Sequence, residues 1–443
     1  MVQDLSQPLP YTADPTWLAL QDVWLFIRIT FTWPLSAGLP SLVFPLCPFR
    51  SGRLDELYPD RDNLWVLFLH TILVFVQGAS LLLLIPSVFI GIPFSPTPVF
   101  FGVVIALIFG NKYFCVLLNG RRRHYVSNID PSWKSFEDER WIFVNGVSVG
   151  DHWMQSNLDR LAMTVRRPVY GIHNTTYGII FDVIECIVQR TFGYATRDIR
   201  DAYASIVESV SNPQYKKIVL ILHSQGVIEG GMALDWLYAT MDQDQLAKIE
   251  VYTFGSAANH FNSPVRSVLG GGSSVGRTSP PTRVIEHIEH YANSGDYVCR
   301  FGILHFRPLP NANQAVNPQN QQIIENRYVG RLFIRKGTGH QLNGNYLDDF
   351  FTMDQRLTKV EDQNANMEAE LDKRLLDDYG IVCKAEEVAA LHMRVQCGDG
   401  IRAPPASVPG QPPRKIKDVS RLWLYRNGGS PPPTVRVQPS LPA

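Results

Sequence analysis

The chain of 443 residues contains one long apolar region near its beginning. From Leu64 to Leu118 the only formally charged residue is Lys112. The first part, up to Ile85, is about as long as a helix that crosses a hydrocarbon core, and a proline-rich stretch separates it from a second apolar run that begins at Val99. The pattern predicts a transmembrane helical hairpin over residues 63–120. A buried helix pair of a soluble domain is the alternative.

A shorter apolar stretch precedes this hairpin. Between Trp17 and Phe31 only Asp22 and Arg28 are charged, so the segment could form a helix that lies along a membrane interface with its tryptophans among the lipid headgroups. The residues before it are polar and contain no basic cluster, which argues against a cleaved signal peptide. We therefore expect residues 1–62 to form an N-terminal segment with an interfacial helix.

The pattern changes beyond residue 125, where short apolar strands alternate with helical segments. Each of these strands ends in a polar or glycine-containing turn, and they lie at residues 140–144, 217–223, 248–254, 283–292 and 331–336. Buried strands that alternate with helices are typical of an α/β domain with a doubly wound, mostly parallel sheet. We predict such a domain over residues 125–400.

The end of the chain, residues 403–443, is rich in proline and is expected to be mostly disordered. Asp418 to Arg426 is the part that could pack locally. A second segment, Ser263 to Thr282, is rich in glycine, serine and proline and is interpreted either as a lid over a site or as a disordered insertion.

The strand that begins at Lys217 carries the clearest chemical signal. It ends in His-Ser224-Gln-Gly226, and a helix-forming segment follows at once, which is the arrangement of a nucleophile elbow. A sharp turn of this kind exposes a serine hydroxyl to a histidine base and to a carbonyl carbon. Gly226 supplies the small residue after the serine, whereas Leu222 stands where the G-x-S-x-G pattern has glycine. A serine that merely begins a helix is the alternative.

Two later strands end in loops that carry an acid and a base. Asp296 follows Asn-Ser-Gly, and His340 lies between glycines in Gly337-Thr-Gly-His-Gln-Leu-Asn-Gly344. In the predicted triad, His340 takes the proton of Ser224 and returns it to the leaving group, while Asp296 holds the imidazole in the required tautomer. The competing histidines and acids lie inside strand or apolar patterns, and they are His287, His290, His305, Glu286 and Glu289.

The strand that ends at Val144 leads into Asn145-Gly146-Val147, which predicts an oxyanion hole. In hydrolases with a nucleophile elbow, a loop after an early strand supplies one backbone amide and the residue after the nucleophile supplies the other. The predicted donors are therefore the amides of Val147 or Gly146 and of Gln225, and each is worth about a hundred- to a thousandfold in rate. An ordinary strand–turn unit is the alternative.

These motifs, with Val251-Tyr-Thr-Phe-Gly-Ser and Gly339-His-Gln-Leu-Asn, resemble those of lipase-like serine hydrolases of the α/β-hydrolase superfamily. The closest resemblance is to poorly characterised fungal and bacterial members with an Asn-Gly turn and a His-Ser-Gln-Gly elbow, and it covers residues 138–350. It implies an α/β-hydrolase fold and a serine esterase or lipase with no cofactor and no metal, with Ser224, Asp296 and His340 as its triad. The chain departs from the family pattern at Leu222 and at Asn145, where lipases usually have histidine.

The loop from Tyr170 to Thr176 is also similar in that group, without an assigned role. Asn174 in this loop begins an Asn-X-Thr sequon. The topology expected below places the loop in the cytosol and so argues against glycosylation.

The composition limits which partners, metal sites and cellular compartments fit this chain. Lysine plus arginine equals aspartate plus glutamate at 41 each, so no overall field favours nucleic acid. The six cysteines have no Cys-X-X-Cys spacing, which argues against a metal site or a disulfide scaffold and fits a reducing compartment. Membrane lipids and a lipid or other ester substrate are the expected partners, and the sequence does not identify any protein partner.

Basic residues flank the apolar region on both sides. Arg50, Arg53 and Arg61 precede it and a triarginine at 121–123 follows, whereas residues 86–98 contain no lysine or arginine. The positive-inside rule therefore predicts an integral membrane protein with both flanks and the hydrolase domain in the cytosol.

The function expected from the sequence is a membrane-anchored serine hydrolase that cleaves carboxylic esters. One alternative is a catalytically degenerate α/β-hydrolase that serves as a membrane interaction module, to which the departure at Leu222 points. The other is an amidase, a peptidase or a thioesterase, because these enzymes use the same triad.

Overall fold

The computed structural model describes residues 14–32, 42, 49–86, 97–122, 124–266, 283–307, 327–369, 381–382 and 415–432. Its centre is an eight-stranded sheet in the order β1-β3-β2-β4-β5-β6-β7-β8. All neighbouring strands are parallel except β1 and β3, which are antiparallel. In chain order the strands are Tyr125–Val126, Glu139–Val144, Val169–Ile172, Lys217–His223, Ile249–Phe254, His287–Asn293, Arg331–Arg335 and Ile381–Val382. The predicted α/β class and the mostly parallel sheet are confirmed.

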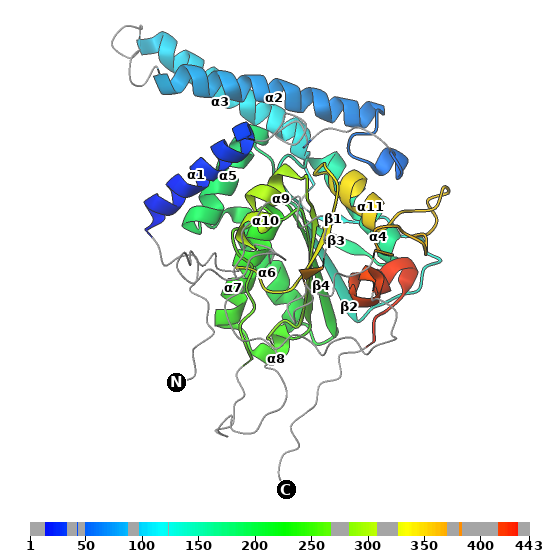
Figure 1. Ribbon diagram of the computed structural model, residues 1–443. Coiled ribbons are helices and arrows are strands. Elements are labelled where there is room, and N and C mark those ends of the chain that lie inside the picture. Colours follow the sequence, from blue (N-terminus) through cyan, green and yellow to red (C-terminus); the bar gives the residue numbers. More distant parts are fainter. Residues whose placement is uncertain are drawn as a thin grey trace, which may run out of the picture.

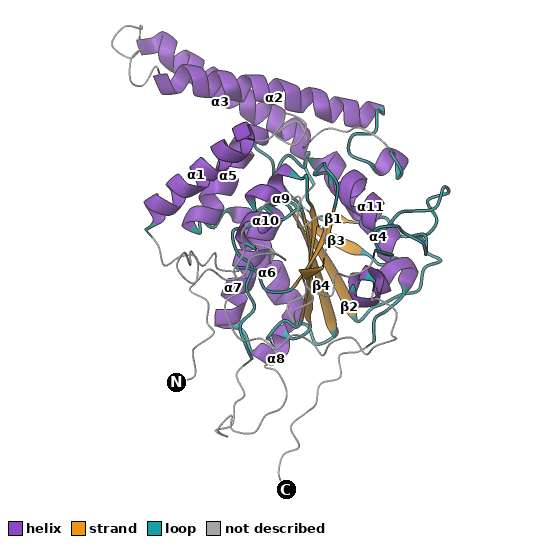
Figure 2. Ribbon diagram, viewed as in Figure 1, coloured by secondary structure: helices purple, strands orange, loops and turns teal. Residues whose placement is uncertain are grey.

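Helices cover both faces of this sheet (Figures 1 and 2). The helices of the domain are α4 (Asp151–Val165), α5 (Ile179–Phe192), α6 (Arg197–Ser211), α7 (Gly226–Thr240), α8 (Gln243–Leu246), α9 (Tyr297–Phe301), α10 (Ile303–Phe306), the π-helical η5 (Leu342–Leu347) and α11 (Asp348–Phe350). In the central strands nearly every residue is buried, as in β4 and β5. This is why these strands appear in the sequence as unbroken apolar runs rather than as alternating ones.

The apolar region near the start of the chain forms two paired helices, α2 (Arg61–Pro86) and α3 (Thr97–Asn119). Each contains a window of 22 residues, Arg61–Leu82 and Pro98–Asn119, that is long and apolar enough to cross a membrane, with mean hydropathy 1.9 and 2.0. Figure 1 shows the pair lying across the end of the domain, with its tip beyond the domain. The predicted pair of apolar helices is therefore present.

The predicted N-terminal helix is also present, as α1 (Pro15–Thr32), and it is docked on the domain. Its buried residues Leu25 and Ile29 pack with Tyr297 and Phe301 of α9. Asp22 forms a buried ion pair with Arg190 of α5, at 2.6 Å.

The described part of the C-terminal region packs against the sheet. It contains α13 (Ile416–Val419) and the 3₁₀-helical η6 (Leu422–Gly428), drawn in red in Figure 1. Trp423 and Tyr425 are buried, and the ring of Tyr425 meets that of Trp141 on β2 edge to face at 4.9 Å. The packing expected for residues 418–426 thus extends to 415–432 and is long-range rather than local. Most of the Ser263–Thr282 segment lies outside the described residues.

Candidate active site

Three segments far apart in the sequence bring Ser224, Asp296 and His340 together. The Nε2 atom of His340 lies 2.8 Å from Oγ of Ser224, and Nδ1 of His340 lies 2.8 Å from Oδ2 of Asp296. All three side chains are buried. The three predicted residues therefore form one continuous hydrogen-bonded chain, with the imidazole between the hydroxyl and the carboxylate.

Ser224 occupies the turn between β4 and α7. Its φ of +58° is in the left-handed region, which costs a residue with a side chain about 1–2 kcal/mol. The turn is fixed on both sides, since the amide of Ser224 donates to the carbonyl of Phe254 at 3.0 Å and its carbonyl accepts from Val227 at 3.2 Å. A strained serine between a strand and a helix is the geometry of a nucleophile elbow.

Leu222, the departure from the expected motif, is accommodated by a glycine on the following helix. A Cβ atom at Gly230 of α7 would lie 2.5 Å from Cδ1 of Leu222, closer than atoms can approach. At the first turn of α7, a Cβ at Gly226 would lie 2.5 Å from the carbonyl oxygen of Val144. The helix can therefore approach both strands closely although residue 222 is large.

Asp296 ends the loop after β6 and accepts hydrogen bonds on both of its oxygens. Its Oδ1 accepts from the amide of Val298 at 2.8 Å, where it caps α9. Its Oδ2 accepts from the hydroxyl of Tyr346 at 2.6 Å in addition to His340. Burial raises the pKa of Asp296, but the charge of His340 and these hydrogen bonds outweigh it and hold the pKa below its ordinary value. The group is therefore a carboxylate at neutral pH.

Tyr346 and His223 are residues of the site that the sequence reasoning missed. The His223 ring is stacked on that of His340, with centroids 4.9 Å apart, and its Nε2 lies 2.9 Å from the carbonyl oxygen of His340. Burial, with the charge of His340, lowers the pKa of His223 to about 3, so this ring is neutral and donates from Nε2. His223 therefore holds the backbone of His340 in place. In the sequence, the one sign of this contact is that His223 directly precedes Ser224.

The loop after β2 lies directly against Ser224. A Cβ atom at Gly146 would lie 2.3 Å from Cβ of Ser224, so only glycine fits there. Ser148, two residues further on, also has a positive φ, and its amide donates to Asp182 at 2.8 Å. In the described part of the chain, the amides of Val147 and Gln225 donate to no other protein group. They are thus available to a substrate oxygen.

The Tyr170–Thr176 loop, which had no assigned role, contacts Gln225 and the residue that precedes Gly146. The amide of Asn174 donates to Oδ1 of Asn145 at 2.9 Å, and Nδ2 of Asn145 donates back to the carbonyl of Asn174 at 2.9 Å. The Asn174 side chain donates to Oε1 of Gln225, also at 2.9 Å. Asn145, which stands where lipases usually have histidine, therefore links the loop after β2 to the Tyr170–Thr176 loop. Asn174 is 3% exposed, which leaves no room for a glycan.

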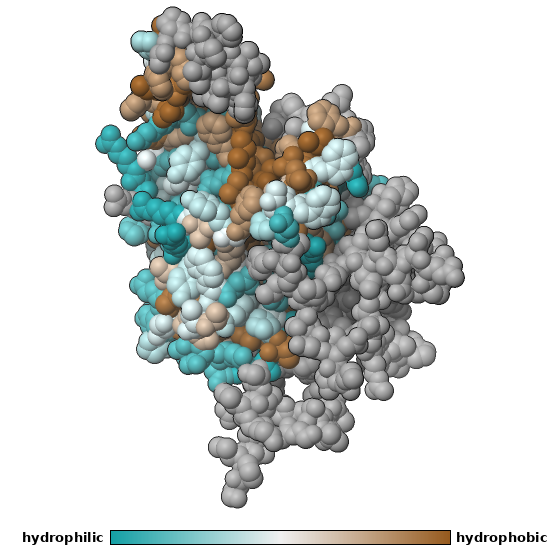
Figure 3. Space-filling model, turned by 90° about the vertical axis from the view of Figure 1, so that its left-hand side faces the viewer, coloured by the Kyte–Doolittle hydropathy of each residue, from teal (hydrophilic) through white to brown (hydrophobic). Residues whose placement is uncertain are grey.

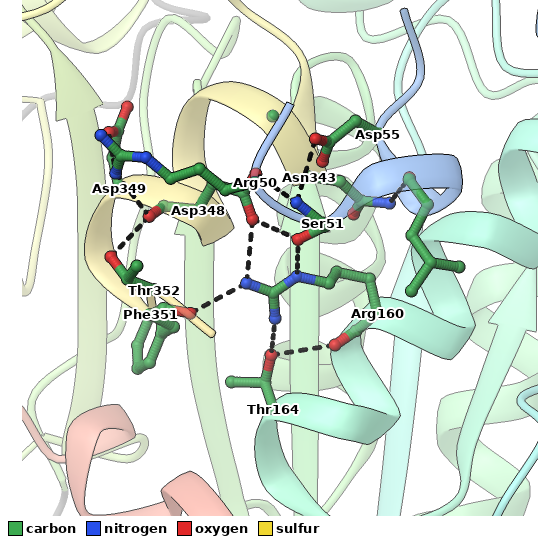
Figure 4. Close-up of polar contacts among 12 residues, drawn as sticks. Arg50, Ser51, Asp55, Arg160, Thr164, Asn343, Asp348, Asp349, Phe351 and Thr352 are labelled. Carbon is green, nitrogen blue, oxygen red and sulfur yellow. Dashed lines mark hydrogen bonds and ion pairs between the residues drawn. The ribbon is translucent and has the colours of Figure 1, made fainter. Parts of the chain in front are cut away.

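The segment that follows His340 is held by a buried polar cluster (Figure 4). The Arg160 guanidinium of α4 contacts Oδ1 of Asp348 at 3.2 Å, the carbonyl of Phe351 at 2.8 Å and the hydroxyl of Ser51 at 2.7 Å. Glu56 accepts from the amide of Asn343 at 2.9 Å. Ser51 and Glu56 precede α2, so the chain before the apolar helices is built into the support of the His340 loop.

His290 and Glu289, which competed with His340 and Asp296 in the sequence, make their hydrogen bonds elsewhere in the domain. His290 binds Oγ1 of Thr253 through Nδ1 at 2.7 Å and the carbonyl of Val329 through Nε2 at 2.9 Å. Glu289 accepts from the amides of Arg421 and Leu422 in the C-terminal segment. Both belong to the packing of the domain.

Among the described residues there is no cluster of three or more histidine, cysteine, aspartate or glutamate side chains that could hold a metal ion. Cys115, Cys186 and Cys299, the cysteines in that part of the chain, are buried free thiols. No protein-family model, curated protein or solved structure is detectably similar to this chain.

Proposed function

We propose that the protein is a serine hydrolase of the α/β-hydrolase type that cleaves carboxylic esters of lipids, without a cofactor or metal. The observation that carries this proposal is the hydrogen-bonded chain of Ser224, His340 and Asp296, with the serine on a strained strand–helix turn. The combination matters because a buried serine–histidine contact alone serves packing in many proteins, whereas the turn presents the hydroxyl to a reactant.

The proposed reaction begins when Ser224 Oγ attacks the ester carbonyl and passes its proton to Nε2 of His340. The carbonyl oxygen then carries negative charge, which the amides of Val147 (or Gly146) and Gln225 stabilise. His340 returns the proton to the departing alcohol and leaves an acyl group on Ser224, which a water molecule removes by the reverse sequence. Asp296 stabilises the imidazolium that forms in both steps.

The position of the apolar helices supports a lipid substrate. The side chains of α1 contact Tyr297, which directly follows Asp296, and the hydroxyl of Thr30 lies 2.7 Å from that of Tyr297. The same helix exposes Trp24 and Phe31 on its outer side. A membrane bound by α1, α2 and α3 would therefore lie next to the catalytic loops. We propose that both flanks of the α2–α3 pair, and with them the hydrolase domain, face the cytosol.

The degenerate-hydrolase alternative rests on Leu222, and the close approach of Gly230 to Leu222 supports an intact strand–helix turn instead. Amidases, peptidases and thioesterases share the proposed triad, so substrates must separate these classes.

The proposal is tested by labelling the purified full-length protein with a fluorophosphonate probe. We expect wild type to be labelled and Ser224→Ala not to be, while Ser211→Ala, an exposed serine on α6, labels like wild type. Parallel turnover of a short-chain ester, the matching amide and the matching thioester then identifies the class. Equal labelling of wild type and Ser224→Ala, or none in either protein when both are folded, contradicts a catalytic role.

A further inference from the structure

The polar residues of the α2–α3 pair bind the hydrolase domain. Gln77 of α2 accepts from the amide of Ile180 at 3.1 Å and donates to the carbonyl of Tyr177. Asn111 of α3 accepts from Gln77 at 2.9 Å. Asn119, at the end of α3, exchanges two hydrogen bonds with the backbone of Thr176, at 2.8 and 3.0 Å. Groups that would be costly in a bilayer are thus paired with one loop of the domain.

The first half of α2 is likewise part of the packed domain. The Trp153 indole on α4 donates to Oδ1 of Asn63 at 2.9 Å, and its ring is stacked on His70 with centroids 5.4 Å apart. Leu69 and Leu73 are fully buried in the main hydrophobic core. From Arg61 to Gln77, one face of α2 is therefore packed against the hydrolase domain.

In the described residues, the helical lengths that remain are each shorter than the hydrocarbon core of a membrane. Beyond Gln77, α2 continues for the nine residues from Gly78 to Pro86, and α3 has the 14 residues from Thr97 to Gly110 before its first contact with the domain loop at Asn111. At about 1.5 Å per residue these segments reach about 14 and 21 Å. A hydrocarbon core is about 30 Å thick.

We infer that the α2–α3 pair is a monotopic anchor, which enters one leaflet of a phospholipid membrane from the cytosolic side and does not cross it. Full crossing would require the bonds of Gln77, Asn111 and Asn119 to break and their polar groups to enter hydrocarbon. Insertion of the distal part alone keeps every one of these bonds. The predicted helical hairpin is retained in this arrangement, and only its depth changes.

Lipid is the occupant that fits the surface of the distal part. In the α3 window only 11% of the residues are buried, and its exposed apolar side chains occupy the sides of the helix that α2 leaves open: Val99, Phe101, Val103, Ile105, Ile108 and Phe109. A protein partner would cover one side of such a helix, whereas lipid chains cover all sides.

Helix α1 adds a second apolar surface beside the pair. Its exposed large apolar side chains gather on one side of the helix, and they are Trp17, Leu20, Val23, Trp24, Ile27 and Phe31. Figure 3, viewed from the side of α1, shows apolar surface below the tip of the pair. We assign this face to the headgroup level of the same leaflet, where tryptophan is favoured.

The test uses two lipid surfaces and the purified full-length protein. Unilamellar phosphatidylcholine vesicles have two leaflets and water on both sides, whereas triolein droplets coated with phosphatidylcholine have a single leaflet over oil. A monotopic anchor floats with both. A hairpin that crosses the bilayer needs water on the far side and therefore floats with vesicles only. Flotation with vesicles only, or with neither surface, overturns the inference.

Two sets of variants make the result specific. Phe101→Asp with Phe109→Asp should reduce flotation on both surfaces by about tenfold or more, because each charge must leave the hydrocarbon. Val126→Asp with Ile129→Asp, also exposed apolar residues but on the domain, should leave flotation unchanged. Unchanged flotation of the first pair, in protein that is folded by circular dichroism, contradicts the assigned surface.

Gln77→Leu with Asn111→Leu distinguishes docking from crossing independently of flotation. These changes make the helices more apolar, so a crossing hairpin should be as stable as wild type or more stable. A docked pair should instead lose several degrees of melting temperature, because the Tyr177 carbonyl and the Ile180 amide are left unpaired. An unchanged or raised melting temperature overturns the inference.

Discussion

Gly230 of α7 lies against Leu222 of β4 so closely that a Cβ atom on the glycine would be 2.5 Å from Cδ1 of the leucine. A nucleophile elbow requires a strand and a helix to approach each other, and the usual pattern meets this need with a glycine two residues before the serine. Here the small residue lies across the contact, on the helix. At Leu222 the small residue of this contact is therefore on the helix and not on the strand, and the strand–helix turn at Ser224 keeps its close packing.

This relationship predicts opposite effects for two adjacent glycines of α7. Gly230→Ala should destabilise the protein by about 1–3 kcal/mol, because Leu222 is fully buried and cannot move aside. Gly231→Ala should be neutral or stabilise by up to about 1 kcal/mol, since its Cβ would meet Phe261 at an ordinary 3.6 Å and alanine favours a helix. Denaturant unfolding measures both.

Leu222→Ala provides the control for the contact between Leu222 and Gly230. In the double variant with Gly230→Ala the clash is absent, so the two losses should be clearly less than additive. Strict additivity would show that the contact between the two residues is not what makes Gly230 necessary.

The sheet and the candidate triad could be predicted from the sequence because their signals are local. A strand buried on both faces, such as β4, is a continuous apolar run, and the turn that follows it carries Ser224 within the same few residues. Asp296 and His340 also follow their strands directly. In a parallel sheet the carboxyl ends of the strands meet at one edge, which brings such loops together.

The rest of the site depends on contacts between distant residues, for which the sequence holds no local signal. Tyr346 lies in a π-helical segment and reaches Asp296, 50 residues away, and Asn174 reaches Gln225, 51 residues away. Hydropathy gave the lengths of α2 and α3 but not the face that each presents to the domain. For that reason the sequence gives no sign that Gln77 contacts the backbone of Tyr177 and Ile180.

Tyr346→Phe tests whether the tyrosine tunes the acid. Loss of its hydroxyl leaves Oδ2 of Asp296 bonded to His340 alone, so the carboxylate holds the imidazolium more strongly. We expect the acid limb of the kcat/KM profile of ester hydrolysis to move to higher pH, with kcat reduced by about tenfold or less. Asp296→Asn should cost about 10⁴ in kcat, the loss known for the same change in another serine hydrolase.

The matched control is Tyr238→Phe, because the Tyr238 hydroxyl donates to the carbonyl of Asn262 at 3.0 Å and touches no member of the candidate triad. It should leave the pH profile in place. If Tyr346→Phe lowers activity equally at every pH, the residue supports packing and does not position the acid.

Arg421 should make the C-terminal segment necessary for stability. Its Nη2 lies 2.8 Å from Oε1 of Glu250, and both side chains are nearly buried. Burial raises the pKa of Glu250, but the hydrogen bonds and charge of Arg421 reverse this and hold it below the ordinary value. Arg421→Ala leaves a buried carboxylate without its cation, which should cost about 3–5 kcal/mol.

Arg426→Ala is the comparison within the same segment, since its partner Asp362 is 77% exposed and such a pair contributes at most about 1 kcal/mol. Thermal unfolding should therefore separate the two variants. Similar melting temperatures would mean that residues 415–432 do not support the sheet. Addition of Glu250→Gln to Arg421→Ala should recover part of the loss, because the stranded charge is then removed.

His290 should make the folded state sensitive to acid. Burial lowers its pKa to about 3, partly opposed by its hydrogen bond to Val329, whereas an unfolded histidine titrates near 6.5. Between these values the unfolded chain binds the extra proton, so the stability that His290 contributes is complete above pH 6.5 and is lost as the pH falls towards 3.

In the variant His290→Gln this pH dependence is absent. The stability difference between wild type and variant should therefore shrink by about 1.4 kcal/mol per pH unit between pH 6 and 4. Urea unfolding at pH 8, 6, 5 and 4 measures this difference, with the exposed His124→Gln as the baseline. A difference that stays constant from pH 8 to 4 would mean that His290 titrates alike in both states and is not held neutral by the core.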